Sequence, residues 1–365
     1  MTDSYRIDDH KLHYHPERIA QWLDAGNDWE KAKKVYPLYI EISPTGMCNH
    51  RCRFCAMDYI GYKPRSLDLD VMRSALKDMG EKGVKSVMLA GEGEPLLYKK
   101  IVELSQAVVA SGIDLAFTTN GVLLDNDRAE QLIPLSTWIK VSIAAGSPET
   151  YAYIHGTDKK DFDRVVENLS RAVEYRDKKG LTCTIGAQFL LLPENVHELE
   201  KITEVAKDRM GLDYLVIKPY SQHLFSNTRE YSEIDYAGML ERLSRIEAMG
   251  TSRFKVIVRK NALRNTIDKS QSVDTCFTTP FLWAYMMSNH DLYSCSAFLQ
   301  DNRFLIGNLE EKSFTEAWEG EGRHRIFDMM TNGFDTGSCR INCRMNAANR
   351  YLWELKHPSG HRNFI

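Results

Sequence analysis

The feature that most constrains this sequence is a group of three closely spaced cysteines, Cys48, Cys52 and Cys55, with Phe54 just before the last. They follow an apolar stretch at residues 36–42 that is typical of a β-strand. Three neighbouring thiolates suit an iron–sulfur cluster, and a four-iron cubane held by three of them keeps one iron open for chemistry. Two alternatives stay open at this point: half of a structural zinc site, and disulfide partners.

The composition is that of an ordinary soluble globular chain, with 43% hydrophobic and 27% charged residues over 365 residues. No apolar run approaches the roughly 18–20 residues of a membrane span, and the polar N-terminus lacks the core of a signal peptide. Eight cysteines without an export signal indicate reduced thiols and metal ligands, so we expect a cytoplasmic protein with no membrane partner. A net charge of −3 offers no broad cationic field, which disfavours nucleic acid as a partner.

From residue 37 the chain alternates short apolar runs with longer amphipathic patterns, as repeated βα units of a parallel sheet do. The patterns predict strands at residues 37–43, 84–90, 113–119, 137–143, 183–192 and 213–219. They predict helices at residues 68–82, 98–111, 126–132, 160–179, 195–209 and 232–249, after a helical lead-in over residues 1–36 that covers the barrel. The predicted class is α/β. Ligands of such sheets bind at the carboxyl ends of the strands, where the three-cysteine loop begins.

Four further cysteines lie beyond this region: Cys276, Cys295, Cys339 and Cys343. Four thiolates can fully ligate a second iron–sulfur cluster, although a structural zinc site remains the alternative. Residues 278–294 predict a hairpin around an Asn-His-Asp turn, and a helix is predicted near residues 345–356. The remaining cysteine, Cys183, starts an apolar strand, and we interpret it as a core residue.

The first three cysteines, at the end of a first strand, resemble the cluster motif of the radical S-adenosylmethionine (SAM) superfamily. The resemblance implies a partial (β/α)6 barrel, a 4Fe–4S cluster on these cysteines, and SAM bound to the open iron. One-electron cleavage of SAM then gives a 5′-deoxyadenosyl radical, with the electron supplied by an external donor such as flavodoxin or ferredoxin. The Gly-Glu-Gly-Glu-Pro turn at residues 91–95 resembles the family's turn that holds the SAM amino group. The resemblance assigns cofactor contacts to Phe54, Gly91, Gly93, Glu94, Asn120 and Ser142.

The second cysteine set resembles the twitch domain, the shortened form of the SPASM domain, which holds one auxiliary 4Fe–4S cluster. The implied domains are a lead-in at residues 1–36, a radical SAM partial barrel at residues 37–250, and a small twitch/SPASM-like domain with a β-hairpin and a helix at residues 251–365. This cluster layout is similar to that of 2-deoxy-scyllo-inosamine dehydrogenase, an enzyme of antibiotic biosynthesis. We therefore expect two 4Fe–4S clusters and SAM as cofactors.

The resemblance implies a class of mechanism and leaves the substrate open. We expect hydrogen abstraction from a small carbohydrate-like molecule and oxidation of a secondary alcohol, with the auxiliary cluster as electron acceptor. The alternatives are epimerisation or decarboxylation of the same substrate class, modification of a peptide, and a non-enzymatic role as an electron-relaying partner. The densest polar group at the mouth of the barrel follows the sixth strand, and from it we expect three catalytic residues: Lys218, Tyr220 and His223.

Overall fold

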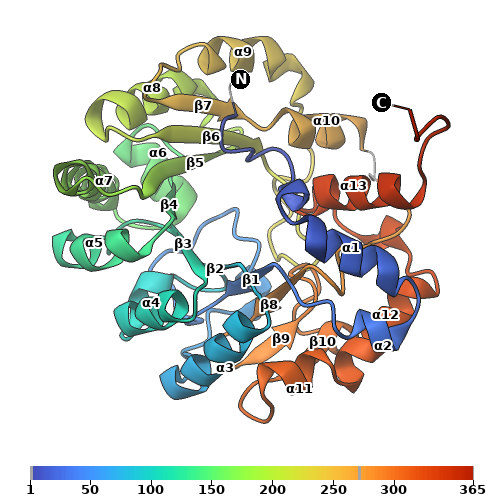
Figure 1. The fold of residues 1–365 in the computed structure, drawn as a ribbon. Helices are drawn as coiled ribbons and strands as arrows, with labels where there is room; N and C mark the ends of the chain where they lie inside the picture. Colours follow the sequence, from blue (N-terminus) through green and yellow to red (C-terminus); the bar gives the residue numbers. More distant parts are fainter. Residues whose placement is uncertain (1–2, 270–272, 365) are drawn as a thin grey trace.

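The central feature of the computed structural model is one curved ten-stranded sheet, in the order β10-β9-β8-β1-β2-β3-β4-β5-β6-β7 (Figure 1). The structure describes residues 3–269 and 273–364. Seven neighbouring strands run parallel in chain order: β1 (Tyr39–Ile42), β2 (Ser86–Leu89), β3 (Asp114–Thr119), β4 (Trp138–Ser142), β5 (Thr184–Leu191), β6 (Tyr214–Pro219) and β7 (Lys255–Val258). Their carboxyl ends therefore meet at one edge, where α/β sheets bind ligands.

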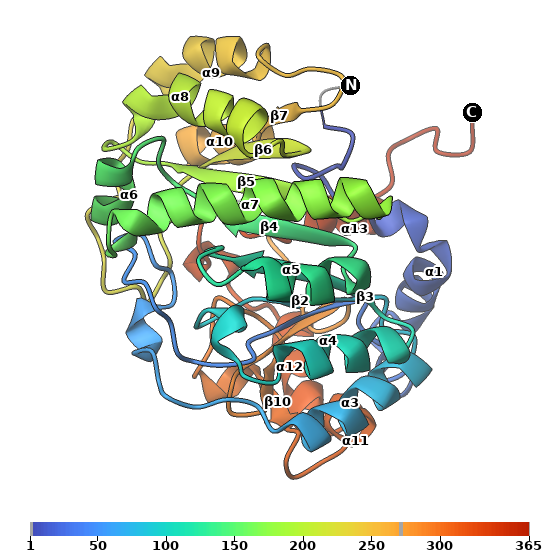
Figure 2. The ribbon, with the colours of Figure 1, turned by 90° about the vertical axis from the view of Figure 1, so that its left-hand side faces the viewer.

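Helices cover the outer face of these strands, and Figure 2 shows α3, α4, α5 and α7 stacked across it. The set comprises α3 (Leu69–Glu81), α4 (Ile101–Ala110), α5 (Asn126–Leu132), α6 (Pro148–His155), α7 (Lys160–Lys179), α8 (Leu199–Glu204), α9 (Leu240–Glu247) and α10 (Lys260–Asp268). The longest, α7, buries Phe162, Leu169 and Val173 along one stripe, as an amphipathic helix on a sheet does. It ends at Gly180, whose φ of 63° suits a glycine cap.

The predicted α/β partial barrel is confirmed, and each predicted strand overlaps an observed one. Two differences follow β6. The helix predicted at residues 232–249 begins its α-helical part only at Leu240, because Tyr236 holds a loop instead. The Tyr236 hydroxyl donates to the Leu191 carbonyl and accepts from the Tyr220 N–H. A seventh parallel strand, β7, lies beyond the predicted barrel limit at residue 250 and pairs with β6.

The C-terminal part adds three strands to the other side of the sheet. β8 (Trp283–Met286) pairs parallel with β1, β9 (Asp291–Tyr293) pairs antiparallel with β8, and β10 (Leu305–Asn308) pairs with β9. The β8–β9 turn carries His290 at a φ of 64°, so the predicted hairpin is confirmed. Three helices follow, the last at its predicted place: α11 (Phe314–Trp318), α12 (Glu321–Thr331) and α13 (Asn346–Lys356). The hairpin therefore extends the sheet of the barrel.

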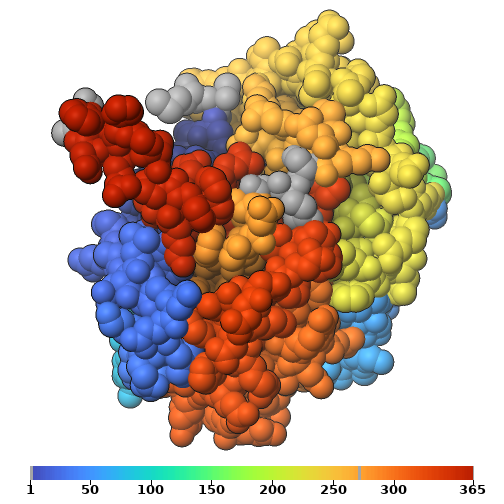
Figure 3. Space-filling view, turned by 90° about the vertical axis from the view of Figure 1, so that its right-hand side faces the viewer, coloured from blue at the N-terminus to red at the C-terminus, as the bar shows by residue number. Residues whose placement is uncertain are grey.

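The N-terminal lead-in contains two helices, α1 (Pro16–Ala25) and α2 (Trp29–Ala32). Trp22 of α1 packs into a buried cluster with Phe281, Phe327 and Leu352 of the C-terminal part, and Figure 3 shows the two segments (blue and red) side by side. Upstream of α1, Tyr5 and Ile7 pack against side chains of β6 and β7. The lead-in thus contacts both the barrel and the C-terminal part.

Two further sequence expectations can be compared with the fold. Cys183 is 3% exposed and belongs to the main apolar core, as predicted. Within residues 3–269 and 273–364, no helix combines the length and the apolar character that crossing a bilayer requires.

Candidate active site

The loop after β1 gathers the three cysteines of the first predicted cluster. Burial, with contributions from the nearby Glu94 and Cys55, raises the pKa of Cys48 to about 11. Burial, followed by the nearness of Cys55 and Cys48, raises the pKa of Cys52 well above its usual range. The hydroxyl of Tyr62 adds a hydrogen bond to Cys55. The three cysteines share one loop, and a metal bound there would hold them as thiolates by lowering these raised pKa values. This donor set fits a cluster with three protein ligands.

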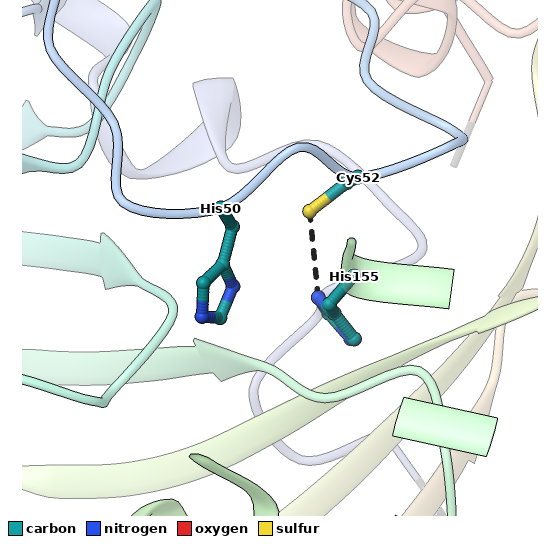
Figure 4. A group of neighbouring side chains, drawn as sticks. All are labelled: His50, Cys52 and His155. Carbon is teal, nitrogen blue, oxygen red and sulfur yellow. Dashed lines mark hydrogen bonds between the residues drawn. The ribbon is translucent and has the colours of Figure 1, made fainter. Parts of the chain in front are cut away.

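A buried histidine, His155 at the end of α6, contacts this loop (Figure 4). The Ala144 N–H donates to His155 Nε2 at 3.0 Å, so that nitrogen carries the lone pair. In a neutral ring the other nitrogen, Nδ1, then carries the proton. It lies 3.4 Å from Cys52 Sγ. Burial lowers the pKa of His155 well below its usual range, which keeps the ring neutral. His155 is therefore a hydrogen-bond donor to a predicted cluster ligand.

His50 faces the same point, and ligand atoms of His50, Cys52 and His155 lie within 4.8 Å of one another (Figure 4). Two imidazoles and a thiolate are a donor set that zinc accepts. However, His155 Nδ1 directs its proton toward the sulfur and has no lone pair for a metal, and Nε2 is engaged by Ala144. We therefore interpret His155 as a partner of Cys52 and not as a metal ligand.

Glu94, predicted to hold the SAM amino group, is buried in the turn after β2. Its carboxylate accepts from the Thr119 hydroxyl at 2.5 Å, the Asn120 N–H at 2.8 Å and the Leu96 N–H at 3.1 Å. Burial raises its pKa. These bonds fix the carboxylate in place, and a carboxylate has about four acceptor positions, so one remains for an ammonium group. The capacity fits the predicted role, and the contact with SAM stays a prediction.

The two glycines of this turn allow it to pack against the cysteine loop. A Cβ on Gly93 would lie 2.2 Å from the Met47 carbonyl oxygen. A Cβ on Gly91, whose φ is 120°, would lie 2.5 Å from Cβ of Ser43. Only glycine fits such close backbone contacts without a shift of the chain. The turn and the cysteine loop are therefore built as one unit, while contact of either glycine with SAM stays a prediction.

The other predicted SAM contacts lie at the same edge of the sheet. The Asn120 side chain donates to Oδ1 of Asn49, inside the cysteine loop, at 2.7 Å. Phe54 packs into a small apolar cluster and meets the His155 ring edge-on, with 5.4 Å between centroids. Ser142 ends β4 opposite Gln188 of β5. Asn120 thus touches the loop directly, whereas Ser142 shares only the strand-end edge with it.

The four later cysteines line a single cavity: Cys276, Cys295, Cys339 and Cys343. Burial, followed by the nearness of Cys343, raises the pKa of Cys295 well above its usual range. Three of the sulfurs accept N–H donors: Cys295 from Ala297 at 3.4 Å, Cys343 from Met345 at 3.4 Å and Cys276 from Asn349 at 3.5 Å. Four sulfurs around one cavity, with donors aimed at them, fit a fully ligated cluster. Four thiolates also suit zinc, so the second cluster stays a prediction.

The structure places the three predicted catalytic residues in different surroundings. Lys218 lines a cavity inside the barrel, and Tyr220 lines another at the start of the loop after β6. His223 is fully buried. Its Nδ1 accepts from the Phe225 N–H at 3.3 Å, and its Nε2 lies 3.4 Å from the Ser296 carbonyl oxygen. Both ring nitrogens of His223 thus have protein partners. Of the three residues, only Lys218 and Tyr220 line a cavity.

Sequence reasoning missed the charged interior of the barrel, of which Lys140 is the clearest member. Along β4, Trp138, Lys140 and Ser142 alternate with the buried Ile139 and Val141, so the first three share one face. The sequence signal that could have indicated this charged interior is a lysine, Lys140, in the middle of an otherwise mostly apolar strand.

Comparisons with known proteins agree with this geometry. A family model described as "Radical SAM superfamily" matches residues 42–206, which include the cysteine loop and the glycine-rich turn. The "Tungsten-containing aldehyde ferredoxin oxidoreductase cofactor-modifying protein" of Pyrococcus furiosus is 22% identical over 331 residues, or 85% of this chain and 88% of that protein. The GTP 3′,8-cyclase of Haemophilus influenzae (strain PittGG) is 31% identical over 178 residues, or 47% of this chain and only 50% of the cyclase.

Among solved structures, Streptococcus suis SuiB bound to the precursor peptide SuiA has a TM-score of 0.62 at 20% identity, covering 85% of this chain and 69% of SuiB. This likeness concerns the fold. The family match begins at Ile42, the last residue of β1, and includes the cysteine loop and the turn predicted to hold SAM. Residues 42–206, less than half of the chain, thus resemble the radical SAM superfamily.

Proposed function

We propose that this protein is a radical SAM enzyme and that it oxidises a secondary alcohol of a small carbohydrate-like molecule, such as a sugar, a nucleoside, a nucleotide sugar or an aminocyclitol. The observation that carries the proposal is the course of the loop after β6, residues 220–229. This loop contacts both cysteine sets. A substrate bound beside it therefore lies near both.

The contacts of the loop are specific hydrogen bonds. On one side, the Ser226 hydroxyl donates to the Cys55 carbonyl at 3.2 Å. On the other side, the Ser221 hydroxyl donates to the Ile341 carbonyl at 2.5 Å, and His223 Nε2 faces the carbonyl of Ser296, the residue after Cys295. The loop is thus fixed between the two cysteine sets.

Asp58, which follows the first cysteine set, makes further hydrogen bonds to the loop after β6. Its carboxylate accepts the N–H groups of Asn227 at 3.0 Å and Thr228 at 3.2 Å. Substrate groups held by this loop are therefore positioned relative to the cysteine loop by several independent bonds.

When bound, SAM and a cluster on Cys48, Cys52 and Cys55 supply hydrogen abstraction, and a cluster on the four later cysteines supplies an electron acceptor. The protein's part is to take the hydroxyl proton of the substrate. Burial, followed by the nearby Arg259 and Lys140, lowers the pKa of Lys218 well below its usual range. A neutral amine facing a cavity can accept a proton, so we assign Lys218 as the base.

The experiment is an anaerobic incubation of the reconstituted protein with SAM, dithionite and a panel of candidate substrates. We expect 5′-deoxyadenosine and a product two mass units lighter than its substrate, formed one for one with SAM consumed. Lys218→Met should still cleave SAM and form little product. A product with the same mass as its substrate would refute oxidation and indicate epimerisation. If only peptides stimulate SAM cleavage, the substrate is a peptide and the proposed substrate class is wrong. Absence of 5′-deoxyadenosine would refute the enzymatic role.

A further inference from the structure

A cavity inside the barrel is lined by an excess of positively charged side chains. Its volume of about 360 Å³ is that of a small-molecule site. Its lining holds five cations, the amine of Lys218 and two carboxylates; the cations are Lys140, Arg259, Arg340, Arg344 and Arg350, and the carboxylates are Asp8 and Asp9. The chain as a whole has a net charge of −3. The positive charge of the cavity is therefore a local concentration and not a property of the whole molecule.

The protein balances only part of this charge. Two of the arginines have carboxylate partners: Arg344 with Glu41, and Arg259 with Asp8 at 3.2 Å. Among residues 3–269 and 273–364, no carboxylate forms an ion pair with Lys140 or Arg340. These two cations come from β4 and from the segment between two of the later cysteines. Two separate parts of the chain thus bring unbalanced charge to one cavity.

Holding these cations together is unfavourable for the free protein. Burial, followed by the nearby Arg344 and Arg259, lowers the pKa of Lys140 to about 8. Lys140 and Lys218 are half-buried, and both line the cavity. Like charges that lower one another's pKa around a cavity are typical of a binding site for the opposite charge.

The same cavity has an apolar and aromatic wall. Trp138, Tyr39 and Met88 line it beside the cations. A ligand that carries both a negatively charged group and an uncharged ring system would therefore find a partner for each part.

We propose that this cavity binds a phosphate or diphosphate group of the substrate. The inference rests on the proposed function and narrows its substrate class to phosphorylated small molecules, such as a sugar phosphate or a nucleotide sugar. Lys218 lies two residues before the loop that contacts both cysteine sets. An anion held in the cavity beside Lys140 and Arg340 therefore leaves the rest of the molecule beside that loop and near the amine of Lys218.

The test is isothermal titration calorimetry of the full chain, with clusters reconstituted anaerobically, using inorganic pyrophosphate, inorganic phosphate and sulfate as probes. We expect pyrophosphate to bind at one site per chain and more tightly than sulfate. Lys140→Met should weaken pyrophosphate binding about 10- to 100-fold, the effect of removing a charged hydrogen-bond donor, and Lys140→Arg should retain most of it. The matched control is Lys77→Met, which removes an exposed lysine from α3.

A second readout separates the cavity from surface adsorption. Because the pKa of Lys140 is about 8, an anion bound beside it should raise that pKa, and Lys140 should take up protons near that pH. The measured enthalpy should then differ between buffers of different ionisation enthalpy. Lys140→Met should reduce this difference, and Lys77→Met should not.

Each outcome bears on one proposal. Equal binding of pyrophosphate by the wild type and Lys140→Met, or equal affinity for sulfate and pyrophosphate, would refute the anion site. If the protein cleaves SAM but binds no pyrophosphate, the anion site fails and the radical chemistry stands. If it binds pyrophosphate but yields no 5′-deoxyadenosine, the proposed function fails and the anion site stands.

Discussion

Replacement of His155 by phenylalanine tests whether a protein side chain tunes the first cluster. His155 donates from Nδ1 to Cys52 Sγ because the Ala144 N–H occupies Nε2. Hydrogen bonds to cluster sulfurs favour the reduced, more negative form and so raise the reduction potential. His155→Phe removes this donor and keeps a ring of similar size. We therefore expect the midpoint potential of the first cluster to fall.

The size of the shift follows from the strength of one hydrogen bond. A net contribution of roughly 0.5–1.5 kcal/mol is typical of such a bond. For a one-electron couple, a tenfold change in the equilibrium, about 1.4 kcal/mol, corresponds to about 59 mV. Loss of the bond should therefore lower the potential by about 20–60 mV. The upper part of that range applies if the bond acts only on the reduced form.

The assay is a redox titration of the anaerobically reconstituted protein, followed by electron paramagnetic resonance of the reduced first cluster. His50→Phe is the matched control, because it removes a neighbouring buried imidazole and leaves the His155–Cys52 contact in place. Circular dichroism and iron content show whether each variant is folded, since His155→Phe also leaves the Ala144 N–H without its acceptor. A folded His155→Phe protein with the potential of the wild type would refute the tuning role.

Three further predictions concern the clusters, SAM and the charged cavity. Reconstituted protein should contain about eight irons, and the variant with Cys48, Cys52 and Cys55 all replaced by alanine should keep about four and lose SAM cleavage; stoichiometric zinc in that variant would contradict an auxiliary iron–sulfur cluster. Glu94→Gln should weaken SAM binding by roughly 1–3 kcal/mol, because a charge-assisted hydrogen bond becomes a neutral one, and an unchanged dissociation constant would make the turn purely structural. Lys140→Met should stabilise the phosphate-free protein, because burial, followed by the nearby Arg344 and Arg259 and partly offset by Glu41, lowers the pKa of Lys140 from 10.5 to about 8. A charged lysine with a lowered folded-state pKa destabilises the fold below that pKa, and the penalty declines as pH rises toward the unfolded value. The gain should be at most about 3 kcal/mol near pH 7 and about 2 kcal/mol near pH 9; anaerobic unfolding experiments that show no gain, or one that grows with pH, would contradict the buried charge.

The strands of the barrel could be predicted because their signal is local. Residues 87–90 form a short apolar run between Gly83 and Gly91, and such a run is typical of a strand that is buried on both faces of a parallel sheet. The partner of β8 could not be predicted in the same way. Tyr39 and Trp283 are register partners across β1 and β8, and no local pattern specifies a pairing between segments so far apart in the sequence.

Some residues of the candidate site could likewise be predicted from local sequence, and others could not. Close spacing brings Cys48, Cys52 and Cys55 together whatever the rest of the fold does. In the second set only Cys339 and Cys343 are close in the sequence, and the fold brings Cys276 and Cys295 to the same cavity. The roles of Lys140 and His155 depend on groups from distant segments. Lys140 matters because Arg259 and Arg344 share its cavity, and the proton on His155 is fixed by a backbone N–H of residue 144. Neither relation leaves a trace in the sequence near those residues.

The pairing of β8 with β1 has a consequence for how this protein can be assembled and divided. β1 is the strand from which the first cysteine loop departs, and β8 covers the edge of β1 that β2 does not. A truncated chain that ends after β7 would leave that edge open, and an uncovered edge strand recruits other chains. Such fragments should aggregate even though their barrel is nominally complete. During synthesis, β1 must also wait for β8 to emerge before its edge is closed, so folding to completion is a late and non-local event.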